Sequence, residues 1–289
     1  MFNFECLISI LQINNKIMKK HVLLLGLFFV SFTVISQDST LFVGNSMVKY
    51  DKNQTLEILQ RILNNQTKKN IIDDVACDGC SLHHHLITLP PFKENFFGSS
   101  AWTTNKIELA ATPSYIINHR FKKVVFQETP MTVVDSVRFI KNTKIDFYRL
   151  DSLTKYHSNQ IYWLEPYAAI YLHSDKNSNI NLDSLYNIVI QRFDNLKQLD
   201  SNLINIPIAF VVKEFIKKYP KVNLQIGGSH PNKRMQFILA CCLYYSMYNG
   251  TPDEIPFLHL FKNDKNQMKE KGLKEYTYSL YKDYLIKYK

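Results

Sequence analysis

Short apolar runs alternate with amphipathic stretches along most of the chain. Apolar runs bounded by turn residues predict β-strands, and they occur at residues 41–46, 70–76, 121–127, 160–164, 206–212 and 222–226. Apolar side chains that recur every three or four residues predict α-helices, and they cover residues 54–63, 133–157, 181–203, 213–219, 233–248 and the tail from 268. Strands that alternate with helices are typical of a parallel sheet with helices on both faces. The pattern therefore predicts one α/β domain over residues 37–289, with a helical C-terminal tail.

Two segments between these elements have the character of loops. Residues 90–105 contain two prolines, several aromatic side chains and a Gly-Ser-Ser sequence, and we expect an irregular segment that could line a substrate cleft. Residues 227–231 read Gly-Gly-Ser-His-Pro and form a second predicted loop. Asn232 follows it and is expected to cap the next helix, because an Asn side chain accepts hydrogen bonds from the free N–H groups of a first helical turn.

Residues 1–36 carry the pattern of a leader and signal peptide. Met18 is followed by two lysines, then by an almost entirely apolar run over residues 22–35, and Ser36 offers a small residue for cleavage. Met18 is a possible true start of the protein. The sequence therefore predicts an exported protein, periplasmic or secreted. The alternative is an uncleaved leader that acts as a membrane anchor, which is the one membrane contact that the sequence suggests.

Composition narrows the partners of the domain. Of the 289 residues, 46% are hydrophobic and 21% charged, which is typical of a globular protein. Eight glycines are too few for glycine-rich repeats and disfavour dinucleotide-binding loops. The formal net charge of +10 reflects lysines spread over a solvated surface, or else attraction to acidic polymers or to an anionic cell surface. Without a recognisable binding module, nucleic acid is not an expected partner of an exported chain. The oligomeric state stays open.

Four cysteines lie beyond the leader, at positions 77, 80, 241 and 242. In an oxidising compartment they permit one or two disulfides, whose pairing the sequence leaves open. Cys77 and Cys80 also have the spacing of a redox pair, but the surrounding thioredoxin-like pattern is missing. Together with His83, His84 and His85, on a predicted short helix, they could bind a metal ion. Zinc sites of this kind usually have a second paired half, and the chain shows none, so no metal site is predicted.

The stretch Leu41-Phe42-Val43-Gly44-Asn45-Ser46 is a predicted strand that runs into a tight turn and a serine. Hydrolases with an α/β fold present a nucleophilic serine in this way, at the carboxyl edge of a parallel sheet. A turn without catalytic meaning is the alternative, because the motif alone is short.

Four segments of the chain, in order, resemble the conserved blocks of the SGNH hydrolases, and in particular their exported bacterial branch. They are residues 41–46, residues 79–86 (Gly-Cys-Ser-Leu-His-His-His-Leu), residues 124–128 (Val-Val-Phe-Gln-Glu) and residues 229–232 (Ser-His-Pro-Asn). The resemblance covers nearly all of the chain after the leader. It implies a three-layer α/β/α flavodoxin-like sandwich with a mostly parallel central sheet, the SGNH hydrolase fold. It also implies an esterase that needs no cofactor.

The resemblance assigns a role to one residue in each block. Ser46 is the expected nucleophile and His230 the general base that takes its proton. Gly79 through its backbone N–H, and Gln127 through its side-chain amide, are the expected donors to the oxyanion of the tetrahedral intermediate. In the family an asparagine is commoner at the position of Gln127.

The chain departs from the family pattern at the acid of the triad. The family usually has an Asp three residues before the histidine, and this position is Gly227. Three explanations follow. Ser46 and His230 work as a dyad, or Glu128 or Glu165 supplies a carboxylate from a neighbouring strand end, or the site has lost its activity and binds ligand only.

These features lead to one expected function and one alternative. The expected function is hydrolysis of an ester, small-molecule or glycan, most plausibly an O-acetyl group on a carbohydrate. The alternative is a catalytically degenerate protein that binds glycans or associates with a surface.

Overall fold

The computed structural model describes most of one of the two units into which the chain divides, Asp38–Lys289, and none of the other, Met1–Gln37. The described residues are 38–45, 47, 55–66, 70–77, 80–86, 96–98, 112–156, 158–167, 170, 181–226, 230–261 and 269–288. The predicted leader, including Met18, therefore lies outside the described residues.

A six-stranded sheet runs through the domain in the order β3-β2-β1-β4-β5-β6. Its strands are β1 (Asp38–Asn45), β2 (Asn70–Cys77), β3 (Phe96–Gly98), β4 (Lys123–Gln127), β5 (Gln160–Leu164) and β6 (Ile204–Ile206). Five strands are parallel, and β3 pairs with β2 in the antiparallel direction at the edge. Numbered along the chain, the five parallel strands have the spatial order 2-1-3-4-5, which defines the flavodoxin-like fold.

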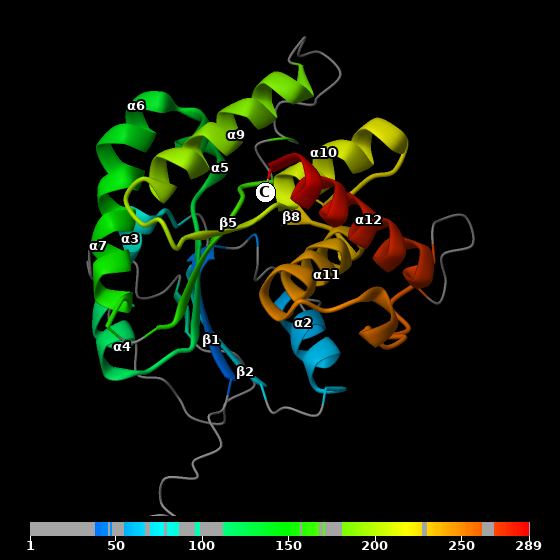
Figure 1. The fold of residues 1–289 in the computed structure, drawn as a ribbon, viewed down its shortest axis with the longest axis horizontal. Coiled ribbons are helices and arrows are strands. Elements are labelled where there is room, and N and C mark those ends of the chain that lie inside the picture. Colours follow the sequence, from blue (N-terminus) through cyan, green and yellow to red (C-terminus); the bar gives the residue numbers. More distant parts are fainter. Residues whose placement is uncertain are drawn as a thin grey trace, which may run out of the picture. The chain divides into compact units, whose positions relative to one another are not determined.

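Helices cover both faces of this sheet, as Figure 1 shows. They are α2 (Thr55–Leu63), α3 (Leu82–Leu86), α4 (Thr112–Asn118), α5 (Pro130–Val134), α6 (Ser136–Arg138), the π-helical turn η2 (Phe139–Thr143), α7 (Lys144–Thr154), α9 (Leu182–Lys197), α10 (Ile208–Lys218), α11 (Lys233–Tyr248), the short η3 (Pro252–Glu254) and α12 (Glu270–Tyr288). Helices α3 to α7 lie on one face, and α2, α11 and α12 on the other. The predicted three-layer α/β/α sandwich with a mostly parallel sheet is confirmed.

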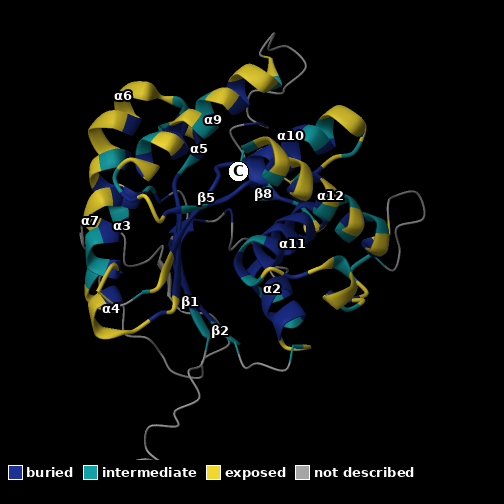
Figure 2. Ribbon diagram, viewed as in Figure 1, coloured by how far each residue is buried: buried dark blue, intermediate teal, exposed yellow. Residues whose placement is uncertain are grey.

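Side chains of the central strands alternate between two hydrophobic cores. Leu41 and Val43 of β1 pack under α3 to α7, whereas Phe42 between them packs under α2 and α11. In β5, Trp163 faces the first core and Tyr162 the second. Because both faces are covered, the inner parts of these strands, residues 41–43 and 161–164, are apolar on both sides, which explains the continuous apolar runs in the sequence. Figure 2 shows the sheet buried between exposed helical surfaces.

The predicted strand over residues 206–212 is wrong. Only its first residue belongs to β6, and the chain then enters α10 at Ile208. The Glu165 carboxylate, which follows β5, accepts hydrogen bonds from the backbone N–H groups of Ala209 and Phe210 at 3.0 and 3.2 Å. These are free donors of the first helical turn, and an anion there stabilises the helix. A contact 44 residues away in sequence thus overrides the local β propensity of Ile-Ala-Phe-Val-Val.

Two further predictions need adjustment. The single helix predicted over residues 133–157 is interrupted at Asp135, whose side chain caps α6 through the N–H groups of Val137 and Arg138. Within residues 90–105, predicted to be irregular, Phe96–Gly98 form edge strand β3, and the other residues of that segment lie outside the described part. The predicted cap at Asn232 is confirmed, because its side chain accepts from Arg234 N and Met235 N at 3.0 Å. No helix among the described residues combines the length and apolarity needed to cross a bilayer.

The pH dependence of stability tests the buried Glu165 carboxylate. Burial raises its pKa from 4.5 to about 7, although four hydrogen bonds oppose this shift. A carboxyl group whose pKa is raised in the folded state stabilises the fold below pH 4.5, and this stabilisation is lost as the pH rises through about 7. The free energy of unfolding of the wild type, relative to that of Glu165→Gln, should therefore fall by roughly 3 kcal/mol from acidic to slightly alkaline pH.

Urea denaturation at several pH values measures this difference. Glu275→Gln on the surface of α12 is the matched control. The Glu275 side chain is half exposed, and its Oε1 lies 4.0 Å from Lys271 Nζ. It should show no comparable trend. A pH-independent difference between wild type and Glu165→Gln would mean that Glu165 does not titrate in this range.

Candidate active site

The carboxyl ends of β1, β4 and β5 lie side by side, and each is followed by a polar residue. Parallel pairing aligns Val43 with Phe126 and Gln127 with Leu164, so Asn45, Gln127 and Glu165 come to the same edge of the sheet. Ligands bind at this edge in open α/β sheets. The predicted site residues Ser46 and Gly79, and Gly227 at the position of the family's Asp, lie outside the described residues. The described part of the site consists of their neighbours.

Gly44 and Gln127 approach each other too closely for a side chain at position 44. A Cβ atom on Gly44 would lie 2.9 Å from Gln127 Oε1 and 3.2 Å from Gln127 Cβ. Real Cβ atoms essentially never make the first of these contacts. The glycine of the first block therefore makes room for the amide of the third block.

The residues on both sides of position 46 are held in place. The Asn45 side chain donates to Cys80 O at 3.3 Å and accepts from Met47 N at 3.0 Å. Tyr167, which follows β5, donates its hydroxyl to Met47 O at 3.0 Å. Asn45 is thus tied to the segment after β2, and Met47 to the segment after β5.

Gln127 keeps one buried hydrogen-bond donor unused. Its Oε1 accepts from the backbone N–H of Asn45 at 3.5 Å. Because that N–H group can only donate, it sets which end of the amide faces β1. Among the described residues, Gln127 Nε2 has no hydrogen-bond partner although the side chain is 2% exposed. An unsatisfied buried donor is costly, and it calls for a role.

His230 lies on a short segment that is fixed at both ends. It is half-buried in β8 (His230–Pro231), which pairs with β7 (Gln225–Ile226) in the antiparallel direction. Asn232 then caps α11, and its backbone N–H and side-chain amide donate to Leu224 O and Asn223 O at 2.9 and 2.8 Å. This local structure limits the movement of His230.

The direction of α11 places His230 toward the same sheet edge. At the end of α11, Tyr248 lies 3.0 Å from the hydroxyl of Thr40 and its ring lies 4.2 Å from Lys123 Nζ, near the amino-terminal ends of β1 and β4. A helix of 16 residues spans about 24 Å. Its N-terminal end, which follows His230, is therefore toward the carboxyl ends of the strands. The distance from His230 to Ser46 stays a prediction because Ser46 lies outside the described residues.

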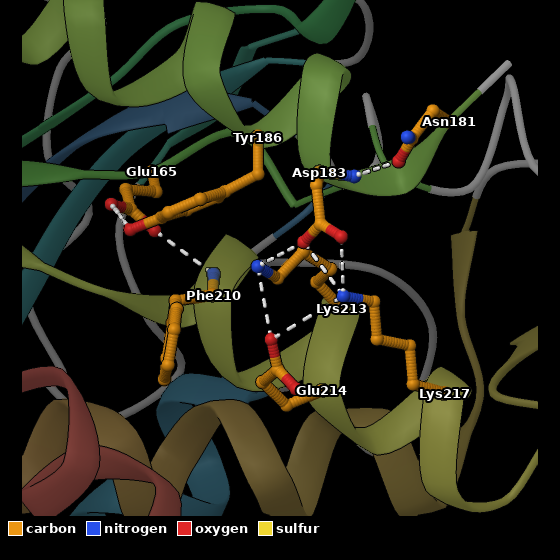
Figure 3. A network of polar contacts seen from close by, with 8 residues as sticks. All are labelled: Glu165, Asn181, Asp183, Tyr186, Phe210, Lys213, Glu214 and Lys217. Atoms are coloured by element: carbon orange, nitrogen blue, oxygen red, sulfur yellow. Dashed lines mark hydrogen bonds and ion pairs between the residues drawn. The ribbon is translucent and has the colours of Figure 1, made fainter.

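Both candidate surrogate acids have other partners. Glu128 accepts from Leu82 N, Thr129 N and Thr143 Oγ1 at 3.3, 2.6 and 3.0 Å, and burial raises its pKa to about 7. Glu165 accepts from the backbone of α10 and from Asn205 and Tyr186 at 2.6 and 3.3 Å, as Figure 3 shows for Tyr186 and Phe210. Within the described part of the chain, His230 is not among the partners of either carboxylate. These hydrogen bonds hold both carboxylates to other parts of the fold, and a role of either one as the acid partner of His230 stays a prediction.

The three consecutive histidines of α3 point to three different partners. His83 lies 3.1 Å from Asp146, and His84 lies 3.0 Å from the backbone N–H and hydroxyl of Ser81. His85 is buried, with Nε2 2.8 Å from Gly44 O and Nδ1 3.0 Å from the hydroxyl of Thr112. Burial lowers the pKa of His85 to about 4, so its ring is neutral and ties α3 to the end of β1. Among the described residues, no group of three or more His, Cys, Asp and Glu side chains could hold a metal ion.

The cysteines divide into two kinds. Cys80 is disulfide-bonded, and the side chain of its partner lies outside the described part. Cys241 and Cys242 are free thiols buried in α11. Burial raises the pKa of both thiols, so they are packing residues and not thiolate nucleophiles.

Comparison with known proteins gives similarity at the level of three-dimensional structure. The chain matches no protein family model and no curated protein. A DUF4886 family protein from Bacteroides uniformis superposes with a TM-score of 0.62 at 11% identity, over 87% of this chain and 95% of that one. The two share a fold.

Two other solved structures superpose with lower TM-scores. A protein described as a putative SGNH hydrolase, from Slackia heliotrinireducens, covers 73% of this chain and all of its own length at 17% identity and a TM-score of 0.48. An acetylxylan esterase from Geobacillus stearothermophilus covers 72% of this chain and 93% of its own length at 13% identity and a TM-score of 0.47.

Sequence reasoning missed two residues that shape this edge. Asn45 was expected only as part of a turn, yet its side chain bridges the segments after β1 and β2. Tyr167 also contacts the backbone just after β1, at Met47 O. The only signal in the sequence was their position, one to three residues after a predicted strand or inside a block resembling the SGNH hydrolases.

The close approach of Gly44 and Gln127 can be tested by the energetic coupling between substitutions at the two positions. Gly44→Ala should destabilise the protein by about 1–3 kcal/mol, because the new methyl group displaces the Gln127 amide. In a Gln127→Ala background the contact with Oε1 is gone and the contact with the Cβ of residue 127 at 3.2 Å is left, so the same change should cost less. A double-mutant cycle from urea denaturation measures the coupling, expected at about 1 kcal/mol or more. Additive effects would contradict the contact.

Proposed function

We propose that this protein is a serine esterase of the SGNH type. One observation carries the proposal: Gln127 presents a buried Nε2 donor that has no partner among the described residues, while its Oε1 accepts from the backbone N–H of Asn45, the residue before Ser46. The resemblance to the SGNH hydrolases puts an oxyanion donor at this position. An orphaned donor beside the predicted nucleophile is what such a role requires in the absence of substrate.

The proposed reaction has two steps. Ser46 Oγ attacks the acyl carbon as His230 takes the hydroxyl proton, and the tetrahedral oxyanion is stabilised by the Ser46 and Gly79 N–H groups and by Gln127 Nε2. The bond to the alcohol then breaks, and His230 returns the proton to the leaving oxygen. Water, deprotonated by His230, then attacks the acyl carbon of the acyl-enzyme. The bond to Ser46 Oγ breaks, His230 returns the proton to that oxygen, and the carboxylic acid is released. The reaction needs no cofactor.

We favour a Ser46–His230 dyad over a triad with a surrogate acid. The oxygens of Glu128 and Glu165 already accept from donors of α3, η2, β6, α9 and α10, so moving either toward His230 would break these contacts. In a comparable triad, losing the function of the acid costs on the order of 10⁴ in kcat and leaves measurable catalysis. A slow enzyme is therefore the expected outcome.

The proposed substrate class rests on two sequence features alone. An O-acetyl group on a carbohydrate agrees with the predicted export and with the resemblance to the exported branch of the SGNH hydrolases. The alternative function, a degenerate glycan-binding or surface-associated protein, is favoured by Gly227 at the position of the usual acid. The two candidates differ in whether Ser46 turns over an ester.

Hydrolysis of p-nitrophenyl acetate by purified protein separates these functions. Ser46→Ala and His230→Asn should each lower kcat by about 10³-fold or more, because each removes one member of the reacting pair. Acetylated glycans assayed for acetate release then extend the test to the proposed substrate. Rates that are equal for wild type and Ser46→Ala would overturn the enzyme function at this serine.

A separate pair of variants tests the role of Gln127. Gln127→Ala removes the Nε2 donor, and Gln127→Glu keeps the side-chain shape and the acceptor for Asn45 N–H but also removes the donor. Both should lower kcat by about 10²–10³-fold with little change in KM. Thermal denaturation monitors whether each variant is folded. Full activity of Gln127→Glu would show that the amide does not stabilise the oxyanion.

A further inference from the structure

Exposed large hydrophobic side chains are concentrated in one stretch of the chain. Ten such residues occur in the described part of the chain, and seven of them fall between residues 117 and 156. They are Ile117, Met131, Val137, Ile140, Ile145, Tyr148 and Tyr156. Figure 2 shows α6 and α7 with broad exposed surfaces on the outer side of the molecule. Single exposed apolar residues are ordinary, whereas apolar residues that form a contiguous patch mark an interaction site.

Four of these residues form a stripe on one continuous helical segment, α6–η2–α7. Val137, Ile140, Ile145 and Tyr148 are 46 to 58% exposed, whereas Phe139, Phe147 and Leu150 of the same segment are fully buried. The step from residue 140 to residue 145 crosses the π-helical turn, which adds one residue and keeps both side chains on the outer side. The segment is therefore apolar on its inner and its outer side. We call Val137, Ile140, Ile145 and Tyr148 the outer stripe.

Cations flank the outer stripe. Arg138, Lys141, Lys144 and Arg149 are exposed or half-exposed on the same segment. The acidic residues of α7 are turned away from this surface, because Asp146 and Asp151 are 3% and 0% exposed and bind His83 and Lys155. Asp135 is the exposed acid here, and it lies 3.4 Å from Arg138. The surface thus combines apolar side chains with an excess of positive charge.

We propose that the outer stripe docks on an anionic lipid surface, with the axis of α6–η2–α7 parallel to that surface. Apolar side chains enter the boundary between headgroups and acyl chains, and flanking cations neutralise anionic headgroups. A second copy of this chain fits less well, because a two-fold contact would place the same four cations against one another. The proposal is independent of the esterase function, and it adds a membrane contact to the one expected through an uncleaved leader.

Tryptophan reporters test this contact at the site itself, in the full chain. Ile140→Trp places a reporter in the outer stripe, and Ile286→Trp places the matched control on α12, where Ile286 is 81% exposed. With vesicles of equal parts phosphatidylcholine and phosphatidylglycerol, emission of the Ile140→Trp protein should shift to the blue and be quenched by brominated lipid. Emission of Ile286→Trp should stay unchanged. Any binding through the leader is common to both proteins and cannot produce this difference.

Two further experiments decide whether the outer stripe binds anionic lipid or a second copy of this chain. Adding Arg138→Gln and Lys141→Gln to Ile140→Trp should weaken vesicle binding by about 30-fold, since each cation near an anionic surface contributes about 1 kcal/mol. Vesicles of phosphatidylcholine alone should give little shift. The proposal is overturned by no shift for Ile140→Trp, by equal shifts for both reporters, or by equal shifts with both lipids. A shift that grows with protein concentration without vesicles would instead assign the stripe to self-association.

Discussion

The second half of the fold depends on the hydrogen bonds that the buried Glu165 carboxylate accepts. Glu165 directly follows β5. Its carboxylate accepts hydrogen bonds from the backbone that begins α10, from Asn205 of β6 and from Tyr186 of α9. Asn205 in turn donates to Tyr284 of α12 at 2.8 Å. Burying a carboxylate is unfavourable, as its raised pKa shows, and these donors offset the cost. Glu165 thereby joins the sheet to α9 and α10, and Asn205 extends the network to α12.

Ion pairs extend the same junction to the surface. Lys213 of α10 lies 2.8 Å from Asp183 of α9 and 2.9 Å from Glu214, and Lys217 lies 2.6 Å from Asp183, as Figure 3 shows. The hydrogen bonds to these lysines hold the pKa of Asp183 at about 2. Because Asp183 is half exposed, each pair contributes little alone. Their effect is to fix the direction in which α10 leaves its buried N-terminal end.

The polar side chains at the carboxyl edge of the sheet differ in their hydrogen bonds, and this difference separates structural residues from candidate site residues. Glu128 and Glu165 are surrounded by donors from several elements, so they hold the structure together. Gln127, beside Glu128, accepts from β1 through Oε1, and its Nε2 has no partner in the part of the chain that the structure describes. A side chain that is fixed in position and still has a free donor is preorganised for a substrate. The position of these residues in the sequence does not reveal this difference, since all three follow or end parallel strands.

The sequence by itself determined the elements whose signals are local. Apolar runs located β1, β4 and β5, and Asn232 located the start of α11, because strand alternation and helix capping involve residues close together in the chain. The order of strands and helices was sufficient for the fold class. Only the tertiary structure decided the state of residues 206–212 and the partners of Glu128, Glu165 and Gln127. Those outcomes rest on hydrogen bonds between residues 15 to 82 positions apart, whose formation depends on how the strands pack side by side.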